Sequence, residues 1–362
     1  MNEKLLTFLE SSFLHDIFFM EGVTDVSYNG KSIFYLHNLE GRKKSTIQIS
    51  SNEVMDFLRQ IANLSERQFS YTTPFLDVSV GKYRINAVHS SIVRVNNEKS
   101  CSFAIRIGSE KCRVVDDMEF LNKECRKYLN DAIQCEKSIV IAGPTGSGKT
   151  ELQKYLLLNL NNNSRVIVID NIEELEFVRS NEEIDLTSWQ ISQNNPNASI
   201  QELVRNALRS NPDWLVIAES RGKEMNEILN SVMTGHPIIT TLHSETLEDI
   251  PNRICRMVEM ADVTQKHESI LSDVFEHIKV CIFVKREIKK NGVKRYVESI
   301  GELQRDHTIK IVYRRKWYGN YIDYFYFYFV SSGRSLLYYY FKYLFFSSYL
   351  CNIHCLLFSY SI

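Results

Sequence analysis

The sequence predicts an α/β protein in which a smaller α+β domain precedes a domain with a parallel sheet covered on both faces. Two observations lead to this prediction. From about residue 117 onward, short and nearly continuous apolar runs alternate with helix-like segments, which is typical of buried parallel strands. The first hundred or so residues instead carry strand-like runs joined by turn signals.

The chain length supports a division into two domains and an appendage. The chain has 362 residues, and a typical domain has about 100 to 200. We expect an N-terminal α+β domain over residues 1–108, a linker over 109–117, an α/β domain over 118–312 and an aromatic-rich tail over 313–362.

The composition is ordinary for a soluble globular chain, with 44% hydrophobic and 24% charged residues. The net charge is -1, which gives the whole molecule no electrostatic reason to bind nucleic acid or an acidic membrane. We therefore expect no direct nucleic-acid binding, although the net charge does not exclude local basic patches.

The cysteines and the N-terminus indicate a cytoplasmic protein. The eight cysteines lack C-x-x-C spacing, which argues against a zinc site or a disulfide framework and favours free thiols in a reducing cytosol. Glu3, Glu10 and Asp16 interrupt the apolar N-terminal stretch, so it lacks the continuous run of a secretory signal.

The elements of the N-terminal domain follow from short local signals. A leading helix precedes two strand-like runs joined by Asn29-Gly30, a strong hairpin signal. Ser50 and Glu53 form a capping box for a helix that reaches about Leu64. The runs FLDVSV, YRINAV and SFAIRIG are strand-like, with a turn at Gly81-Lys82.

The second domain alternates predicted helices with buried strands. The predicted helices are Met118 to Gln134, Lys149 to about Leu160, and one opened by Ser199 with Glu202 and stopped by Pro212. The predicted strands are SIVIAG, RVIVID, WLVIAE and PIITTLH.

The tail differs sharply in composition from the rest. Its last 46 residues hold 19 of the 42 aromatic residues. Tyr343 to Ile362 has the length of a membrane span and no formal charge, but polar residues interrupt it. A membrane helix, a poorly ordered or aggregation-prone tail, and a terminus from an altered reading frame all stay open.

A glycine-rich segment between an apolar strand and a helix predicts a phosphate-binding loop. Its glycines allow successive N–H groups to face phosphate oxygens, and the helix N-terminus adds a favourable dipole. Lys149 would reach the β- and γ-phosphates, and Thr150 would bind Mg²⁺. The alternative is an ordinary glycine-rich turn. The loop consists of Gly143, Pro144, Thr145, Gly146, Ser147, Gly148, Lys149 and Thr150.

Carboxylates at two strand ends are candidates to support hydrolysis. Glu219 ends WLVIAE, where an unpaired carboxylate is costly, so metal-bound water is a plausible partner. Asp170 ends RVIVID, and Glu173 and Glu174 follow just beyond it. The alternative for these residues is a solvated strand end.

These motifs, in this order and spacing, closely resemble the secretion ATPases of type II and type IV secretion, pilus assembly and conjugation. The resemblance rests on GPTGSGKT, VIDNIEEL, LRSNPDWLVIAESRGKE and TGHPIITTLHS, and covers roughly residues 25–303. It implies a RecA-like ATPase domain that binds ATP and Mg²⁺. The implied assignments are Lys149 and Thr150 to Walker A, Asp170 and Glu174 to the acidic box, Glu219 to Walker B with metal contact, His236 and His243 to the histidine box, and Arg84 and Arg106 to the arginines that reach the nucleotide.

The sequence departs from the family pattern in two places. Asn171 stands where the acidic box commonly has a second acidic residue, which leaves the roles of Asp170 and Glu174 open. The four-cysteine zinc element of pilus extension members is missing. The chain therefore looks more like the conjugation and type IV secretion branch, or the tight-adherence pilus branch.

Several of these residues also have structural explanations. A histidine at a strand end, such as His243, is as often a satisfied structural group as a functional one. Arg209 and Arg221 flank WLVIAE and could contact phosphate across a subunit boundary, but a surface salt bridge explains either equally well.

The resemblance implies a homo-hexameric ring at the cytoplasmic face of a membrane secretion complex, peripherally associated with its membrane components. Hydrolysis by in-line attack of water would open and close the domains in turn. Two alternatives stay open: a DNA-translocating motor on the same core, and a nucleotide-binding scaffold with little turnover.

Overall fold

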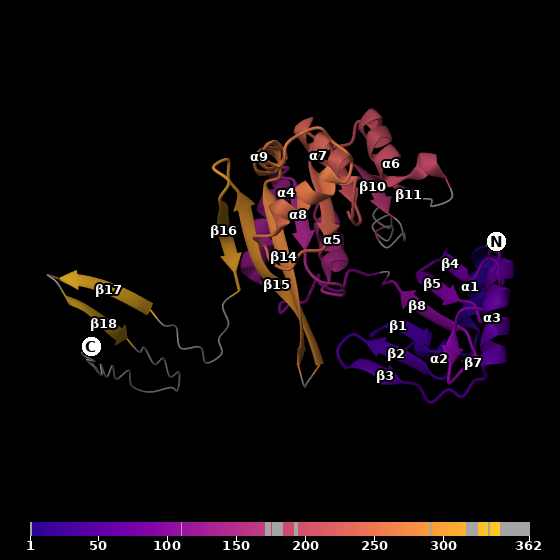
Figure 1. Ribbon diagram of the computed structural model, residues 1–362. Helices are drawn as coiled ribbons and strands as arrows, with labels where there is room; N and C mark the ends of the chain where they lie inside the picture. Colours follow the sequence, from indigo (N-terminus) through magenta and orange to yellow (C-terminus); the bar gives the residue numbers. More distant parts are fainter. Residues whose placement is uncertain are drawn as a thin grey trace. The chain divides into compact units, whose positions relative to one another are not determined.

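The computed structural model describes residues 2–109, 111–170, 175, 184–191, 195–289, 292–315, 325–331 and 334–340. The chain divides into two compact units, Met1–Arg314 and Arg315–Ile362. The first unit contains two large sheets, built from residues 23–107 and 139–314 (Figure 1). The domain boundaries stated above stay a prediction.

The first sheet has six antiparallel strands with helices packed on one face. Residues along β4 alternate between exposed and buried, which is the pattern of a sheet with one solvated face. Its buried face packs against apolar side chains of the three helices. The order is β3 (Gly41–Lys44), β2 (Ile33–His37), β1 (Val23–Tyr28), β8 (Ser102–Ile107), β5 (Tyr83–Val88) and β4 (Phe75–Val80), with α1 (Asn2–Glu10), α2 (His15–Phe18) and α3 (Ser51–Leu64), and a separate ribbon of β6 (Arg94–Val95) and β7 (Glu98–Lys99).

Local signals in this region are confirmed. The strands that flank Asn29-Gly30 pair as a hairpin. Asn29 Oδ1 accepts backbone N–H bonds from Lys31 and Ser32, and Gly30 takes a φ of +92°. The Ser50 capping box forms, and its helix ends at Leu64 as predicted.

The second sheet has eight strands and is parallel except at one edge. The order is β11 (Asp185–Gln190), β10 (Arg165–Asp170), β12 (Trp214–Ile217), β13 (Ile238–Leu242), β9 (Ile139–Ala142), β14 (Val280–Lys289), β15 (Gly292–Leu303) and β16 (Ile309–Arg314). The first six strands are parallel, and β15 and β16 are antiparallel. The antiparallel edge was not part of the sequence prediction.

Helices cover both faces of this sheet, as predicted. In β9, Ile139 and Ile141 pack with one apolar cluster, and Val140 and Ala142 pack with another. The first cluster includes α4 (Lys123–Gln134) and α5 (Lys149–Leu158). The second includes α6 (Ile200–Ala207), α7 (Met225–Met233), α8 (Ile250–Glu259) and α9 (His267–His277). Because both faces are covered, every residue of β9 and β12 is buried.

Two predicted helix boundaries were wrong. The helix predicted from Met118 begins at Lys123, because Asn122 caps it by accepting the N–H of Cys125. The preceding residues form a turn in which Asp117 accepts two backbone N–H groups. The helix that begins at Lys149 ends at Leu158 rather than near Leu160.

The second unit contains one described hairpin, formed by β17 (Phe325–Ser331) and β18 (Arg334–Tyr340). The candidate membrane segment, Tyr343 to Ile362, lies outside the described residues. Within the described part of the chain, every helix is too short or too polar to cross a bilayer.

The central strands predict where the second domain is most sensitive to truncation of a side chain. Leu215 in β12 is fully buried, so Leu215→Ala should cost about 2–5 kcal/mol in unfolding free energy. Ile311→Ala is the control, since Ile311 is 37% exposed on β16. Urea unfolding followed by circular dichroism would measure both variants, and equal losses would contradict this view of the core.

Candidate functional site: a phosphate loop at the carboxyl ends of parallel strands

The glycine-rich loop connects the end of β9 to the start of α5. Its glycines take positive φ angles, +150° at Gly143 and +99° at Gly148. A Cβ on Gly143 would lie 2.2 Å from the carbonyl oxygen of Val284, and one on Gly148 would lie 2.7 Å from the ring of Phe120. Only glycine therefore allows the loop to approach its neighbours this closely.

Lys149 is buried against the loop that it follows. Its Nζ donates to the carbonyl oxygens of Gly143 at 2.9 Å and Pro144 at 3.1 Å. The N–H of Ser147 also donates to Pro144 O, at 3.3 Å. The loop's own carbonyl oxygens thus accept hydrogen bonds from the same donors that would bind a phosphate group.

Burial lowers the pKa of Lys149 to about 8, from an ordinary value of 10.5. Two charged neighbours oppose each other, since Glu219 raises this pKa and Arg221 lowers it. The ammonium group is therefore mostly protonated near pH 7 and loses its proton more readily than an exposed lysine.

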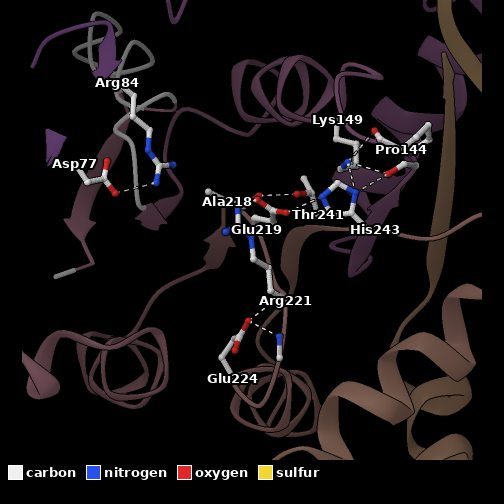
Figure 2. A network of polar contacts seen from close by, with 12 residues as sticks. Asp77, Arg84, Pro144, Lys149, Ala218, Glu219, Arg221, Glu224, Thr241 and His243 are labelled. Carbon is white, nitrogen blue, oxygen red and sulfur yellow. Dashed lines mark hydrogen bonds and ion pairs between the residues drawn. The ribbon is translucent and has the colours of Figure 1, made fainter. Parts of the chain in front are cut away.

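Glu219 lies two residues beyond β12, beside His243 at the end of β13 (Figure 2). Arg221 donates to Glu219 Oε2 at 2.6 Å, and His243 Nε2 lies 2.9 Å from Oε1. The histidine contact is close but lacks hydrogen-bond geometry, so Oε1 is buried without a donor. Burial acts to raise the pKa of Glu219, but Arg221, His243 and Lys149 together hold it below its ordinary value.

The other nitrogen of His243 faces the phosphate loop. Its Nδ1 lies 3.2 Å from Gly143 O and 3.3 Å from Lys149 Nζ. The ring can donate to the carbonyl or accept from the ammonium, according to which nitrogen carries the proton. Nearby, the Thr241 hydroxyl donates to Ala218 O at 2.7 Å and links β13 to the residue before Glu219.

One cavity of about 1420 Å³ gathers most of the predicted site residues. Those that line it are Thr145, Gly146, Gly148, Lys149, Thr150, Asp170, Glu219, His243 and Arg106. Asp170, at the end of β10, is 2% exposed and accepts the N–H of Leu175 at 3.2 Å. Glu173, Glu174 and Asn171 lie outside the described residues.

Gly143, Pro144 and Ser147 belong to the same loop without lining the cavity, and three other predicted residues lie elsewhere. Arg84 pairs with Asp77 at 3.5 Å and does not line this cavity, whereas its cross-strand neighbour Arg106 does. His236 precedes β13, at the opposite end of that strand from His243, and lines a separate cavity of about 250 Å³. Arg209 is exposed.

Two predicted magnesium ligands fit that role in the cavity. Thr150 and Glu219 both line it, and Glu219 Oε1 is a buried oxygen that lacks a donor. Mg²⁺ prefers oxygen ligands and is usually bound by one or two carboxylates together with phosphates and water. Among the described residues, no group of three or more His, Cys, Asp or Glu side chains could bind a metal.

Sequence reasoning missed several residues that surround the loop. Phe120, Arg113, Arg286 and Arg295 line the same cavity. Arg286 and Arg295 are cross-strand partners in the β14–β15 hairpin. Two arginines in separate strand-like runs gave no sequence signal, because only the register of the hairpin brings them together.

The site defines a class of protein: an α/β domain whose phosphate loop meets polar side chains at the carboxyl ends of parallel strands. Residues 88–306 match the family described as type II/IV secretion system protein. The chain belongs to this family.

Similar proteins and structures agree with this family. An uncharacterized Bacillus anthracis protein is 27% identical over 290 residues, which are 78% of this chain but only 64% of that protein. The type IV secretion system protein VirB11 of Bartonella henselae is 28% identical over 283 residues, covering 67% of this chain and 77% of VirB11.

Solved structures confirm the predicted RecA-like fold with an N-terminal domain. The Legionella pneumophila ATPase DotB has a TM-score of 0.60 at 19% identity, covering 84% of this chain and 82% of DotB. The pilus retraction motor PilT with bound ADP has a TM-score of 0.54 at 18% identity, covering 87% of this chain and 83% of PilT.

The lowered pKa of Lys149 predicts that ADP affinity depends on pH. Phosphate binds the protonated amine and raises its pKa, so affinity should be constant below about pH 8 and fall up to about tenfold per unit above it. Titration calorimetry at pH 7, 8 and 9 would show this decline and proton uptake on binding. Lys149→Arg is the control because arginine stays charged, so a flat profile in both proteins would contradict the prediction.

Proposed function

We propose that this chain is an ATP-hydrolysing, magnesium-dependent motor subunit of a membrane secretion, conjugation or pilus-assembly machine. One observation carries the proposal: Lys149 from the phosphate loop, Glu219 from the end of β12 and His243 from the end of β13 meet at one cavity. This places a phosphate-binding cation near a partly buried, anionic carboxylate.

The loop binds the phosphates in this proposal. Lys149 Nζ and the N–H of Ser147 exchange the carbonyls of Gly143 and Pro144 for phosphate oxygens. Gly148 starts α5, whose N-terminal dipole favours the same negative charge.

Glu219 orients the attacking water for in-line displacement at the γ-phosphate. Its Oε1 lacks a donor, and Arg221 keeps it anionic. His243 lies between this carboxylate and Lys149, where it can position the γ-phosphate end. Thr150 and Glu219 would hold Mg²⁺, which would neutralise phosphate charge, and Arg106 adds a cation from the N-terminal sheet.

Family membership and the similarity to VirB11 and PilT support the role in a secretion or pilus machine. In line with the resemblance, we propose that six copies form a ring. The ring associates peripherally with membrane components at the cytoplasmic face. Asp170 and Glu174 are the proposed acidic box, and Arg84 is the proposed second arginine, which would have to leave Asp77 to reach the cavity.

Two substitutions test the chemistry. Lys149→Ala should abolish measurable ATP turnover, because the loop loses its buried cation. Glu219→Gln should keep ATP binding but lower turnover by about 10²–10⁴-fold, since the amide cannot activate water. Phosphate release and ATP calorimetry would measure the two effects, with Lys310→Ala as an exposed lysine control.

Three outcomes would contradict the proposal in different ways. Absence of ATP and ADP binding to the folded wild-type chain would remove the nucleotide role. Normal binding without turnover would favour a scaffold. Strong stimulation of turnover by DNA would favour a nucleic-acid-translocating motor.

The assembly is tested separately. We expect particles of about six times the 42.3 kDa chain mass when nucleotide and magnesium are present. Mass photometry of the full chain, and of a truncation ending at Arg315, would measure this and separate the tail from the core. Monomers under all conditions, in both proteins, would contradict the ring.

A further inference from the structure

One guanidinium connects the phosphate loop to the N-terminal sheet. Arg295 on β15 donates from Nε to the carbonyl oxygen of Gly146 at 2.7 Å. It donates from Nη1 to the carbonyl oxygen of Asn38 at 2.9 Å. Gly146 belongs to the loop, and Asn38 begins the turn between β2 and β3, so the two acceptors are far apart in sequence.

The turn that receives Arg295 is held in place by its own contacts. Asn38 N donates to Gly22 O at 2.7 Å. The Nδ1 of His37 accepts the N–H groups of Leu39 at 3.3 Å and Glu40 at 3.2 Å. These bonds orient the carbonyl groups of residues 38 and 39 toward the β14–β15 hairpin.

The tip of the hairpin fits against this turn at close range. Val293 N donates to Leu39 O at 3.0 Å. Gly292 has a φ of +123°, and a Cβ there would lie 2.2 Å from Leu39 O. The approach thus requires glycine, and it places Arg295 three residues further along the same strand.

The contact with Gly146 bears on phosphate binding through the geometry of the peptide bond. In a planar trans peptide, the C=O of one residue and the N–H of the next point in opposite directions. Holding the Gly146 carbonyl therefore fixes the direction of the Ser147 N–H, which now donates to Pro144 O at 3.3 Å. Arg286 makes a weaker bond of the same kind to Thr145 O, at 3.4 Å.

The charges around Arg295 make this link responsive to an anion. Burial, followed by the neighbouring charges of Arg286 and Arg113, lowers the pKa of Arg295, and only Asp25 acts in the opposite sense. Like charges gathered at a cavity repel one another until an anionic ligand binds. A nucleotide would therefore change both the loop peptide and the electrostatic environment of the guanidinium.

We propose that Arg295 is a positioning residue that couples the nucleotide state of the phosphate loop to the turn of residues 38–40. This inference rests on the proposed function, in which the loop binds ATP. When phosphate draws the Ser147 N–H away from Pro144 O, the Gly146 carbonyl turns with it. The hydrogen bond from Arg295 to the Asn38 carbonyl then changes, so nucleotide binding at the loop alters the turn of residues 38–40 in the N-terminal sheet.

Hydrogen exchange measured by mass spectrometry, on the full chain with and without Mg·ADP, tests the coupling. In the wild type, ADP should slow exchange in peptides that contain the loop and change exchange in peptides that contain residues 38–40. In Arg295→Ala, the loop should still respond but the turn should not. ADP affinity should fall about 5- to 20-fold, because a charge-assisted bond no longer orients the loop.

Three further variants sharpen the result. Arg314→Ala is the matched control, since it removes an arginine of the same sheet whose partner is Glu248 on the surface, and it should behave as wild type. Arg295→Lys should restore the turn response only in part, because one ammonium replaces a planar fork. Gly292→Ala should keep ADP affinity near wild type and lose the turn response, since it blocks the hairpin tip while leaving the loop contact.

The outcomes separate the coupling from the nucleotide role. If wild-type protein binds ADP but the turn is unaffected, the coupling is overturned. It is equally overturned if the turn responds normally in Arg295→Ala. If wild-type protein binds no nucleotide, the proposed function itself fails.

Discussion

The site depends on how closely the phosphate loop packs against β14 and the turn before α4. At Gly143 the loop passes so near β14 that a single methyl group would overlap a backbone carbonyl, and at Gly148 the same is true of the Phe120 ring. The Val284 carbonyl is backbone and cannot move aside as a flexible side chain can, and the Phe120 ring is buried. The positions of Lys149 and of the loop amides are therefore set by rigid neighbours, which is the preorganisation that phosphate binding requires.

Much of the fold could be predicted because its signals are local. The apolar run SIVIAG needs both faces covered, and the capping box at Ser50 identifies the start of a helix from four adjacent residues. The antiparallel edge formed by β15 and β16 could not be predicted in this way. Its strands mix charged and apolar residues, and their place in the sheet depends on pairing with β14.

The same distinction explains how far the site could be predicted. The loop is contiguous in sequence, so its residues were identified together, and Glu219 was recognised because a carboxylate at the end of a buried strand needs a partner. Arg295 carries no comparable signal. Its importance arises from contacts with Gly146 and Asn38, which lie 149 and 257 residues away in the chain. Long-range register of this kind is not encoded in any short motif.

The local charge of the cavity also differs from what the whole-chain charge suggests. The net charge of -1 gives no general attraction for polyanions. The cavity, however, is lined by nine Lys and Arg residues against seven Asp and Glu residues, an excess of two cations. Because Coulomb interactions fall with distance and are screened by salt, this local excess acts on a bound ligand more strongly than distant surface charges do.

Pairing among these charges also accounts for the arrangement of the site. Lys149 is buried and would be unstable as an isolated cation, but two loop carbonyls accept hydrogen bonds from its Nζ and Glu219 stabilises its charge. Glu219 is in turn kept anionic by Arg221. A phosphate group can replace the carbonyls as acceptors while Glu219 and Arg221 remain paired. The loop can therefore exchange one set of acceptors for another without leaving a buried charge unpaired at either stage.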